Sequence, residues 1–445
     1  MNPSPPLWRQ LTSAASVLQA VRAGESATPA LAAVDGALRP GVQSLVFRAL
    51  RELGRAEALR KQLAGRAPPP EADALLCTAL ALACNEHDAP YEAFTLVDQA
   101  VEAAKRNPAT AKQASFINAC LRRFLRERVP LMAAISQDPV VLWNHPRWWI
   151  NRLKQDHPSR WQDILRANNT QAPMTLRVNA RRSTQHDYLR TLADAGIEAQ
   201  AVGTQGVVLA RAQPVHDIPG FGDGVVSVQD AAAQLAAQLL LGWPDQLPQP
   251  AVAGDRLRVL DACAAPGGKT AHLLELADAD VVAMDIDPAR CERIHQNLDR
   301  VGLKAQVIAG DAAEPSGWWD GKTFDAILLD APCTASGIVR RHPDVRWLRR
   351  ETDIAQLAAI QARLLAALWP LLRPGGRLLY CTCSVFRAEG DNQVQTFVAH
   401  NTDAVLRPSP GHLMPHSGAK VDAVPDNLQG DHDGFFYALL EKSTA

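Results

Sequence analysis

Two short cysteine-containing motifs could carry covalent chemistry. Asp330-Ala-Pro-Cys333 and Tyr380-Cys-Thr-Cys-Ser384 each follow a run of apolar residues that is typical of a buried strand. A free cysteine is most often a small buried hydrophobe, but this explanation is weaker for a Pro-Cys and a Thr-Cys that end strands, where a thiolate can act as a nucleophile. The cysteines that we interpret as buried hydrophobes are Cys77, Cys84, Cys120 and Cys291.

A thiolate suits methyl transfer to a carbon atom that is not itself electron-rich. Amines and hydroxyls accept a methyl group directly, whereas C5 of a pyrimidine does so only after a thiolate has added to C6. A base must then remove the C5 proton so that the thiolate can leave. Asp330 is placed to contact N3 and N4 of a cytosine ring during the addition. Spacing alone does not decide whether Cys333 or Cys383 attacks the ring.

A glycine-containing loop could bind a cofactor near these motifs. The segment Asp261-Ala-Cys-Ala-Ala-Pro-Gly-Gly-Lys-Thr270 follows a predicted strand and begins a predicted helix. Gly267 and Gly268 allow a ligand to approach the backbone closely. The ending GGKT imitates a phosphate-binding loop, but that motif requires glycine at the position of Cys263. A phosphate cradle is therefore disfavoured.

Acidic residues end successive predicted strands. Asp285 could accept hydrogen bonds from both hydroxyls of an unphosphorylated ribose, and Asp311 could reach an adenine amino group. A single aspartate at such a place is often only a helix cap or a turn former. That explanation is weak for a set of four, and together with the C5 chemistry the set predicts S-adenosylmethionine as the cofactor. The four residues are Asp261, Asp285, Asp311 and Asp330.

The elements that must position these residues alternate between strand and helix. This alternation predicts a mostly parallel sheet, with the ligand beyond the carboxyl ends of the strands. The predicted strands are 257–260, 281–284, 306–308, 324–329 and 377–380. The predicted helices are 270–277, 288–301 and 354–372, the last closed by the turn sequence 373–376.

The part of the chain before this region divides into a helical segment and a mixed segment. Residues 1–143 repeat apolar positions near a period of 3.6, which predicts several short helices. Residues 144–235 combine expected strands at 174–178, 207–210 and 225–228 with a helix at 188–195. The uncharged stretch 74–84 is too short to span a membrane, and the N-terminus resembles no secretory signal. We therefore expect a cytoplasmic protein with free thiols and no membrane partner.

The charge of the chain is balanced overall and uneven locally. There are 46 Lys and Arg against 47 Asp and Glu, which excludes a uniformly basic nucleic-acid coat and an acidic tail. Residues 105–128 carry seven basic residues and one acid, and residues 340–350 carry five arginines and one acid. Each segment could bind phosphate or form a solvated helix face. Trp347 could stack on a base or pack in a core.

Three motifs resemble those of the RNA cytosine-C5 methyltransferases of the RsmB (Sun, Fmu) family: DACAAPGGKT, DAPCTASGIVRRHPDVRWLRR and YCTCSVFRAEGDNQ. LRVN at 176–179 and VSVQDAAAQ at 226–234 resemble the preceding module of that family, and NACLRRFLRE at 118–127 is similar to its NusB-like domain. The resemblance covers nearly the whole chain. It implies a multidomain protein: an all-α NusB-like RNA-binding domain (1–143), a small α+β, RRM-like module (144–235) and an α/β Rossmann-like class I methyltransferase domain (236–445).

The resemblance also implies a role for each motif. Cys383 would be the nucleophile, Cys333 would assist release of the product, and Asp330 would complete the catalytic set. Cys381 departs from the family pattern, in which a small residue such as alanine or serine is common. No metal is implied. Contacts to S-adenosyl-L-methionine are implied for Cys263, Ala264, Ala265, Pro266, Gly267, Gly268, Lys269, Asp285, Asp311 and Asp330.

The implied substrate is 16S ribosomal RNA, because the helical N-terminal domain resembles the one that accompanies that activity. Two alternatives stay open. One is the same chemistry on transfer RNA, and the other is a catalytically weak RNA-binding assembly factor. A monomer is the default expectation for the oligomeric state.

Overall fold

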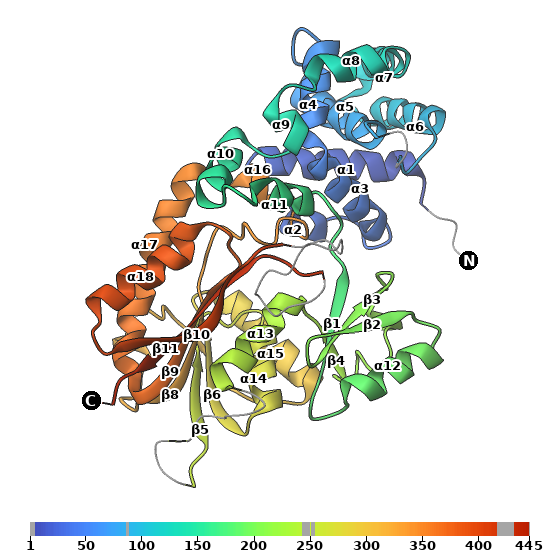
Figure 1. Ribbon diagram of the computed structural model, residues 1–445. Helices are drawn as coiled ribbons and strands as arrows, with labels where there is room; N and C mark the ends of the chain where they lie inside the picture. Colours follow the sequence, from blue (N-terminus) through green and yellow to red (C-terminus); the bar gives the residue numbers. More distant parts are fainter. Residues whose placement is uncertain (1–4, 86–88, 243–249, 251–253, 416–430, 445) are drawn as a thin grey trace. The chain divides into compact units, whose positions relative to one another are not determined.

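The computed structural model describes residues 5–85, 89–242, 250, 254–415 and 431–444. The chain divides into two compact units, one of residues 1–169 with 339–351 and one of residues 170–338 with 352–445. The first unit is helical, and the second contains both sheets (Figure 1). The segment 339–351 therefore leaves the second unit, contributes to the first and returns.

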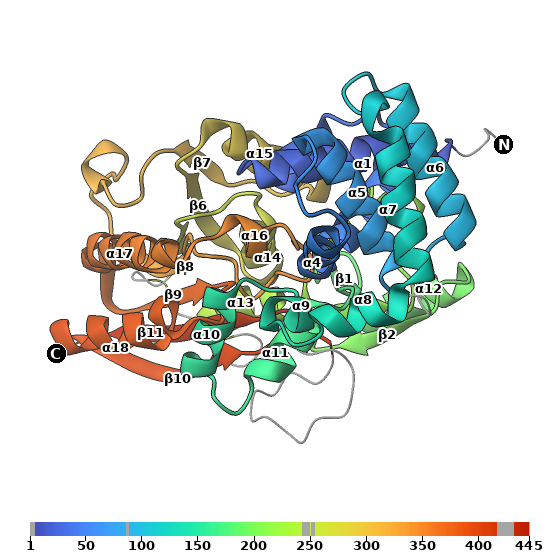
Figure 2. The ribbon, with the colours of Figure 1, turned by 90° about the horizontal axis from the view of Figure 1, so that it is seen from above.

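The helical unit is built around α5 (Pro70–Ala83), which begins after a run of prolines and carries Glu71 and Asp73 in its first turn. Every residue of α5 from Ala74 to Ala83 is buried, so this apolar stretch is a core helix, as its length predicts. It packs against α1, α3, α4, α6 and α7, and Figure 2 shows several of these helices beside it. Their bounds are α1 Leu7–Arg22, α3 Arg39–Arg51, α4 Leu53–Leu63, α6 Ala93–Arg106 and α7 Ala114–Arg126.

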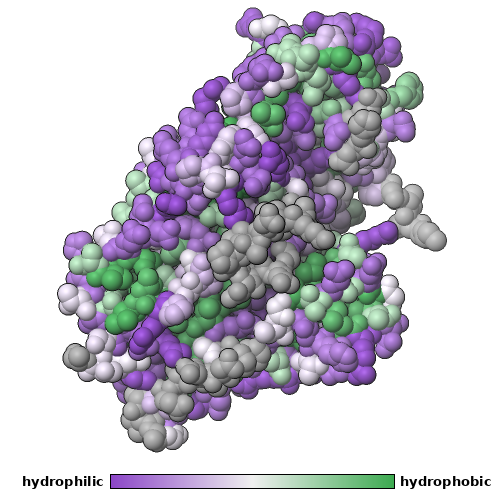
Figure 3. Space-filling view, viewed as in Figure 1, coloured by the Kyte–Doolittle hydropathy of each residue, from purple (hydrophilic) through white to green (hydrophobic). Residues whose placement is uncertain are grey.

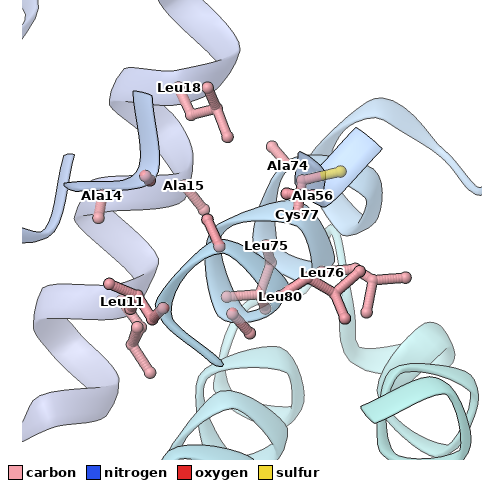
Figure 4. Close-up of a cluster of buried hydrophobic side chains, with 14 of the residues drawn as sticks. Leu11, Ala14, Ala15, Leu18, Ala56, Ala74, Leu75, Leu76, Cys77 and Leu80 are labelled. Carbon is pink, nitrogen blue, oxygen red and sulfur yellow. The ribbon is translucent and has the colours of Figure 1, made fainter. Parts of the chain in front are cut away.

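Small side chains let the central helices approach closely. In Figure 4, Ala15 of α1 points toward Leu75 of α5, and both residues are buried. This close packing suits the alanine-rich sequence of the unit. The shorter helices of the unit are α2 Ala27–Ala32, α8 Arg128–Ile135, α9 Pro139–Trp143, α10 Arg147–Asp156, α11 Trp161–Asn168, α16 Val345–Leu348 and the 3-10 turn η2 Ala111–Gln113.

The second unit begins with a small antiparallel sheet of order β2-β3-β1-β4. Its central strand β1 pairs with β3 and with β4, and α12 packs on β2 and β3. The sequence predicts all of these elements except β2 and η3. The elements are β1 Met174–Val178, α12 Gln185–Asp194, β2 Ala199–Val202, β3 Gly206–Leu209, η3 Val215–Asp217 and β4 Val226–Val228.

The larger sheet has seven strands in the order β10-β11-β9-β8-β5-β6-β7. The five strands from β9 to β7 are parallel, and β11 and β10 continue the sheet in antiparallel fashion. The parallel strands agree with the prediction, and the two antiparallel strands were not predicted. The strands are β5 Leu257–Asp261, β6 Ala279–Asp285, β7 Gln306–Ala309, β8 Phe324–Asp330, β9 Leu372–Thr382, β10 Ala404–Leu413 and β11 Phe435–Lys442.

Helices cover both faces of this sheet. Val259 and Val281 pack with α13, α14 and α15 in one cluster, whereas Leu260 and Val282 pack with α17 and α18 in another. Figure 1 shows the two groups of helices on opposite sides of the strands. Alternate residues of the central strands thus face different layers, which explains why these strands are mainly apolar on both faces. The helices and turns are α13 Ala231–Leu241, α14 Gly268–Leu276, α15 Pro288–Val301, η4 Pro315–Gly317, α17 Glu351–Leu368, η5 Trp369–Leu371, η6 Arg387–Glu389 and α18 Asp391–His400.

One stretch of helix, Glu351–Leu371, is long and apolar enough by length and composition to cross a membrane. Leu364, Leu365 and Leu368 of this stretch are buried against the large sheet. A core helix of a globular protein meets the same criterion. The face of the protein shown in Figure 3 is mostly hydrophilic, with smaller hydrophobic groups between.

Candidate active site

The predicted site residues lie at one edge of the large sheet. Because β9, β8, β5, β6 and β7 are parallel neighbours, their carboxyl ends form a row. The chain runs from β5 to β6 and β7 on one side, and later to β8 and β9 on the other. This reversal of direction is where open parallel sheets bind ligands. The row contains Cys383, Asp330, Asp261, Asp285 and Asp311.

Asp261, the last residue of β5, is fully buried. Its Oδ2 accepts a hydrogen bond of 2.7 Å from the Thr270 hydroxyl, while Oδ1 has no partner among the described residues. Burial raises the pKa of Asp261 to about 7, and the nearby carboxylate of Asp330 adds to this rise. An unpartnered acceptor at this place is suited to a cationic or hydrogen-bond-donating ligand.

Gly267 supplies the tight turn between β5 and α14. Its φ of +94° lies in the region that side chains disfavour, and a Cβ there would stand 3.1 Å from Cα of Ile294. The loop therefore passes close to α15. Cys263, within the loop, is partly buried, and burial followed by the charge of Asp330 raises the pKa of its thiol.

Asp285 ends β6 and is buried, with 3% of its surface exposed. Its Oδ2 accepts from the backbone N–H of Ala265 at 3.3 Å, and its Oδ1 lies 3.4 Å from Arg290. The next residue, Ile286, was not singled out from the sequence, yet it is 66% exposed. An exposed large apolar side chain beside a buried carboxylate offers a surface for a flat ring.

Asp311 lies beyond the end of β7, and both of its carboxylate oxygens are engaged. Oδ1 accepts from the backbone N–H of Ala313 at 2.9 Å, which is the turn-forming use of an aspartate. Oδ2 lies 3.0 Å from Nη2 of Arg363 in α17. The structure thus places Asp311 at the carboxyl-end edge of the sheet, as predicted, where it forms an ion pair with Arg363.

Lys269 and Asp330 form an ion pair across the edge, with Nζ 2.6 Å from Oδ2. Burial alone lowers the pKa of Lys269, but the charges of Asp330, Cys381 and Cys383 outweigh it and raise the pKa above its usual value. Lys269 is therefore a permanent cation beside the thiols. A cation next to a thiol favours the thiolate form.

Cys333 and Cys383 meet in the structure, with 3.4 Å between their Sγ atoms. Cys383 is partly exposed and Cys333 is buried. The hydrogen bond with Cys383, followed by burial, raises the pKa of the Cys333 thiol well above its usual value. The two motifs that the sequence places 50 residues apart therefore form one thiol pair at the ends of β8 and β9.

Cys381 lies near the pair of Cys333 and Cys383 but contacts Asp330. It is fully buried in β9, opposite Asp330 in the strand register, and its Sγ lies 3.6 Å from Oδ1 of that carboxylate. Burial, followed by the charge of Asp330, raises the pKa of the Cys381 thiol well above its usual value. This thiol is a weak donor to Asp330, and all eight cysteines are free.

The segment 340–350 does not form the basic surface patch considered from its sequence. Arg340 and Arg346 are fully buried in the helical unit. Arg346 donates to the backbone carbonyls of Asn144 at 3.1 Å and Asn168 at 2.6 Å, and also to the side chain of Asn169. Arg346 therefore binds helix ends within the helical unit and does not face a phosphate at the surface.

Trp347 packs in the helical core, which is the second of the two uses considered for it. Its Nε1 donates to the Leu50 carbonyl at 2.8 Å, and its ring packs against the hydrophobic cluster of the helical unit. The other basic segment is mostly exposed, with Arg122, Arg123 and Arg126 on one helix, α7. Arg123 pairs with Glu127 at 3.0 Å.

The carboxylates and the exposed apolar side chain of the site fit S-adenosylmethionine. This molecule combines an ammonium and a sulfonium with a ribose diol and an adenine ring. The buried carboxylate of Asp261, with its unpartnered oxygen, suits the cationic part, and Asp285 with Ile286 suits the nucleoside part. No group of three or more His, Cys, Asp or Glu that could hold a metal occurs in the described part of the chain. The fold and the site together define a Rossmann-like methyltransferase that uses S-adenosylmethionine.

Comparison with known proteins identifies the family. Family models match three successive parts of the chain: the NusB family over residues 10–126, the ferredoxin-like domain described as Methyltr_RsmF/B-like over 145–216, and the 16S rRNA methyltransferase RsmB/F over 251–441. The chain is 39% identical over 441 residues to "Ribosomal RNA small subunit methyltransferase B" of Vibrio cholerae, covering 97% of this chain and 96% of that protein.

Two further comparisons agree with this result. The protein of the same name from Pseudomonas putida is 47% identical over 336 residues, 74% of this chain and 73% of that protein. A crystal structure of a "Methyltransferase Homolog Protein" from Pyrococcus horikoshii is 27% identical, with a TM-score of 0.55 over 68% of this chain and 97% of that one. The chain belongs to the ribosomal RNA small subunit methyltransferase B family.

Proposed function

We propose that this chain transfers the methyl group of S-adenosyl-L-methionine to C5 of a cytosine in 16S ribosomal RNA through a covalent cysteine adduct. The observation that carries the proposal is the 3.4 Å separation of the Cys333 and Cys383 sulfurs at the edge that also holds the acidic residues. The choice of 16S rRNA is supported by the names of the relatives and of the family model.

Cys383 is the nucleophile, because it is the more exposed thiol and lies near the Lys269 cation. Its thiolate forms a bond to C6 of the ring, which places an electron pair at C5. S-adenosylmethionine supplies an electrophilic methyl group when it is bound. Cys333 stays protonated beside the Cys383 thiolate and can donate its S–H to it, which lowers the cost of forming the thiolate.

Release of the product uses the same two thiols, with Cys333 as the base and Cys383 as the leaving group. Once Cys383 is bonded to C6, it no longer shares a proton with Cys333. The largest cause of the raised pKa of Cys333 is then gone, so Cys333 can release its proton to solvent water and act as a base in its thiolate form. Removal of the C5 proton restores the C5–C6 double bond and expels the Cys383 thiolate. Cys333 is a thiol again after this step.

Asp330 and the cofactor loop orient the reactants. The Asp330 carboxylate is ion-paired with Lys269, and we assign it to the N3 and N4 side of the cytosine. We assign cofactor contacts to Asp285 with Ile286, to Asp311 and to the loop from Cys263 to Lys269. The target base must leave its stack to reach these groups.

The remaining parts of the chain bind the substrate in this proposal. We assign RNA binding to the helical domain (1–143), and positioning to the small module (144–235) before the catalytic domain (236–445). The exposed arginines of α7 support this assignment, because arginine grips phosphate oxygens bidentately. We further propose that the protein acts as a monomer in the cytoplasm. A molar mass of one chain, 48.2 kDa, by light scattering is the expected result for the monomer.

The test compares Cys383→Ala and Cys333→Ala with the unchanged protein. Each is incubated with small-subunit ribosomal RNA and cofactor labelled in the methyl group. Cys383→Ala is expected to form neither 5-methylcytosine nor an adduct. Cys333→Ala is expected to accumulate a covalent protein–RNA complex that survives denaturing electrophoresis, because the adduct forms and release fails.

Cys120→Ala is the matched control, since Cys120 is a free thiol of the helical unit. Full activity of Cys383→Ala would refute the assignment of the nucleophile. An adduct in Cys383→Ala and none in Cys333→Ala would exchange the two roles. Transfer RNA is run in parallel. Methylation of transfer RNA alone would overturn the proposed substrate, and bisulfite mapping locates the modified cytosine.

A further inference from the structure

A buried carboxylate outside the residues assigned so far lies behind the thiol pair. Glu389, in η6 after β9, is fully buried. Its oxygens accept hydrogen bonds from the Thr334 backbone N–H at 2.8 Å, the Thr334 hydroxyl at 2.5 Å, the Ser384 hydroxyl at 2.6 Å and the Gln361 side chain at 3.3 Å. Four donors from three separate segments thus converge on one side chain.

Three of the four donors belong to the immediate neighbours of the two cysteines. Thr334 follows Cys333, and Ser384 follows Cys383, so the carboxylate joins the two loops directly behind their sulfur atoms. Glu389 is also fixed by its own backbone, since its carbonyl accepts from the Tyr380 hydroxyl at 2.8 Å. The position of this carboxylate therefore controls the spacing of the two loops.

Stability alone does not account for a charged group at this place. Within the part of the chain that the structure describes, the donors to Glu389 are backbone, hydroxyl and amide groups, with no lysine or arginine among them. A buried carboxylate without a cation is costly, and apolar residues of similar size often serve a core better. An ionised carboxylate accepts at both oxygens, so it can hold several hydroxyl donors at once.

We propose that Glu389 is a positioning residue that holds Cys333 and Cys383 at the distance required for proton exchange between their sulfurs. The proposal rests on the covalent mechanism proposed above. Its geometric consequence is independent of that mechanism, because the spacing of two thiols can be measured without any methyl transfer.

Disulfide trapping measures this spacing directly. A diazene oxidant such as diamide takes two electrons and two protons from the Cys333 and Cys383 thiols, which join as a disulfide, and the diazene is reduced to a hydrazine. The unchanged protein is expected to form this disulfide readily, because the sulfurs need to move from 3.4 Å to about 2.0 Å. Peptide mapping by mass spectrometry identifies the bridge.

Glu389→Gln places a donating amide where one carboxylate oxygen accepts, so the loops lose part of their connection. We expect at least about a tenfold slower disulfide formation, since displacements of about 1 Å can change rates by about a hundredfold. In the methylation assay we expect kcat to fall with the KM for RNA unchanged, and the covalent adduct to accumulate, as in Cys333→Ala. Glu389→Asp keeps the charge and is expected to restore part of both rates.

Asp325→Asn is the matched control. Asp325 is a buried carboxylate near the start of β8, and it accepts from the Arg258 backbone N–H at 2.8 Å and from Arg373 at 2.5 Å. This variant removes a buried charge at the end of the strand remote from the thiols, so it is expected to lower the melting temperature without slowing disulfide formation. Binding of S-adenosylhomocysteine by calorimetry verifies that each variant is folded.

The possible outcomes separate the two proposals. Equal disulfide rates in Glu389→Gln, Asp325→Asn and the unchanged protein would overturn the positioning role. A slow disulfide rate in Glu389→Gln combined with full activity of Cys383→Ala would leave the positioning of the thiols standing and refute the covalent mechanism. If Glu389→Gln fails to fold, Thr334→Val and Ser384→Ala each remove one hydroxyl donor, and normal disulfide rates in both would overturn the proposal.

Discussion

Replacing Arg177 with methionine is expected to weaken both the fold of the catalytic unit and its affinity for the cofactor. Arg177 lies in β1 with 1% of its surface exposed. Its Nε and Nη2 donate to the two oxygens of Glu275 in α14, at 3.0 and 2.7 Å. Its Nη1 donates to Gln229 at 2.5 Å and to the carbonyl of Gly268 at 2.9 Å. Gly268 belongs to the loop 263–269, to which we assign cofactor contacts, so this arginine connects the small sheet to the proposed site.

The magnitude follows from what the substitution leaves behind. Removing one member of a buried ion pair costs about 3–5 kcal/mol, because the other charge stays buried without compensation. The acceptors on Gln229 and Gly268 each lose a donor, which adds about 1 kcal/mol apiece. We therefore expect Arg177→Met to lower the free energy of unfolding by about 6 kcal/mol, and Glu275→Met by about 4 kcal/mol.

The double variant separates the ion pair from its surroundings. Arg177→Met with Glu275→Met buries two apolar side chains and no charge, so its loss is expected to be smaller than either single loss. The free energy of unfolding is measured by urea titration of the full chain, with the transition of this unit identified by its shift on addition of S-adenosylhomocysteine. Cofactor affinity should stay reduced in the double variant, because Gly268 still lacks its donor.

Two results would refute this reasoning. Losses below about 1 kcal/mol in both single variants would show that the pair is not buried as the structure places it. Additive losses in the double variant, within about 0.5 kcal/mol, would show that the two side chains do not interact. Glu441→Gln is a suitable control, since Glu441 pairs with Arg407 at the surface, where ion pairs contribute less than about 1 kcal/mol.

Three further predictions concern the cofactor edge. Ile286→Ser is expected to weaken cofactor binding at least about tenfold, because burial of such a side chain contributes about 1.5–3 kcal/mol, and calorimetry should show this without a change in melting temperature. Gly267→Ala is expected to cost about 1–3 kcal/mol in thermal unfolding, since its φ is +94° and the new Cβ would lie 3.1 Å from Cα of Ile294; an unchanged melting temperature would contradict it. Burial raises the pKa of Asp261 to about 7, above its unfolded value of about 3.9, so between these values the folded protein retains a proton that the unfolded chain loses. The free energy of unfolding should therefore fall as pH rises from about 4 to about 7. Unfolding experiments at a series of pH values should show that Asp261→Asn removes this part of the pH dependence.

The sequence is most informative where local pattern and tertiary environment agree. The helix predicted at Pro288–Val301 has these bounds in the structure, because Asp287 caps its start and Gly302, with a φ of +72°, ends it. The strands β5, β6 and β8 were predictable because each is mainly apolar and ends in an aspartate. The strand order of the structure then places Asp330, Asp261 and Asp285 at the ends of neighbouring strands.

The two C-terminal strands lack such a signal. The strand β10 contains Pro408, Pro410 and Gly411, residues that disfavour a strand, and it tolerates them because it lies at the edge of the sheet. The segment Arg373–Gly376, expected to be a turn, is part of β9, where the pairing with β8 shifts in register between Phe324 and Ala326. Such irregularities depend on neighbouring strands and not on local propensity.

The role of Glu389 and the place of the segment 339–351 depend on partners far away in the sequence, so no local pattern could reveal them. A run of arginines is usually exposed, because a guanidinium is costly to bury. Arg346 is nevertheless fully buried, since its two terminal nitrogens donate to carbonyl groups at the ends of α9 and α11, where helices leave acceptors unpaired. Burial lowers the pKa of Arg346 to about 9, so this arrangement has a cost that the hydrogen bonds must offset. The chain reaches this buried segment shortly after Cys333, which means that the loop carrying one reactive thiol is covalently continuous with the core of the helical unit.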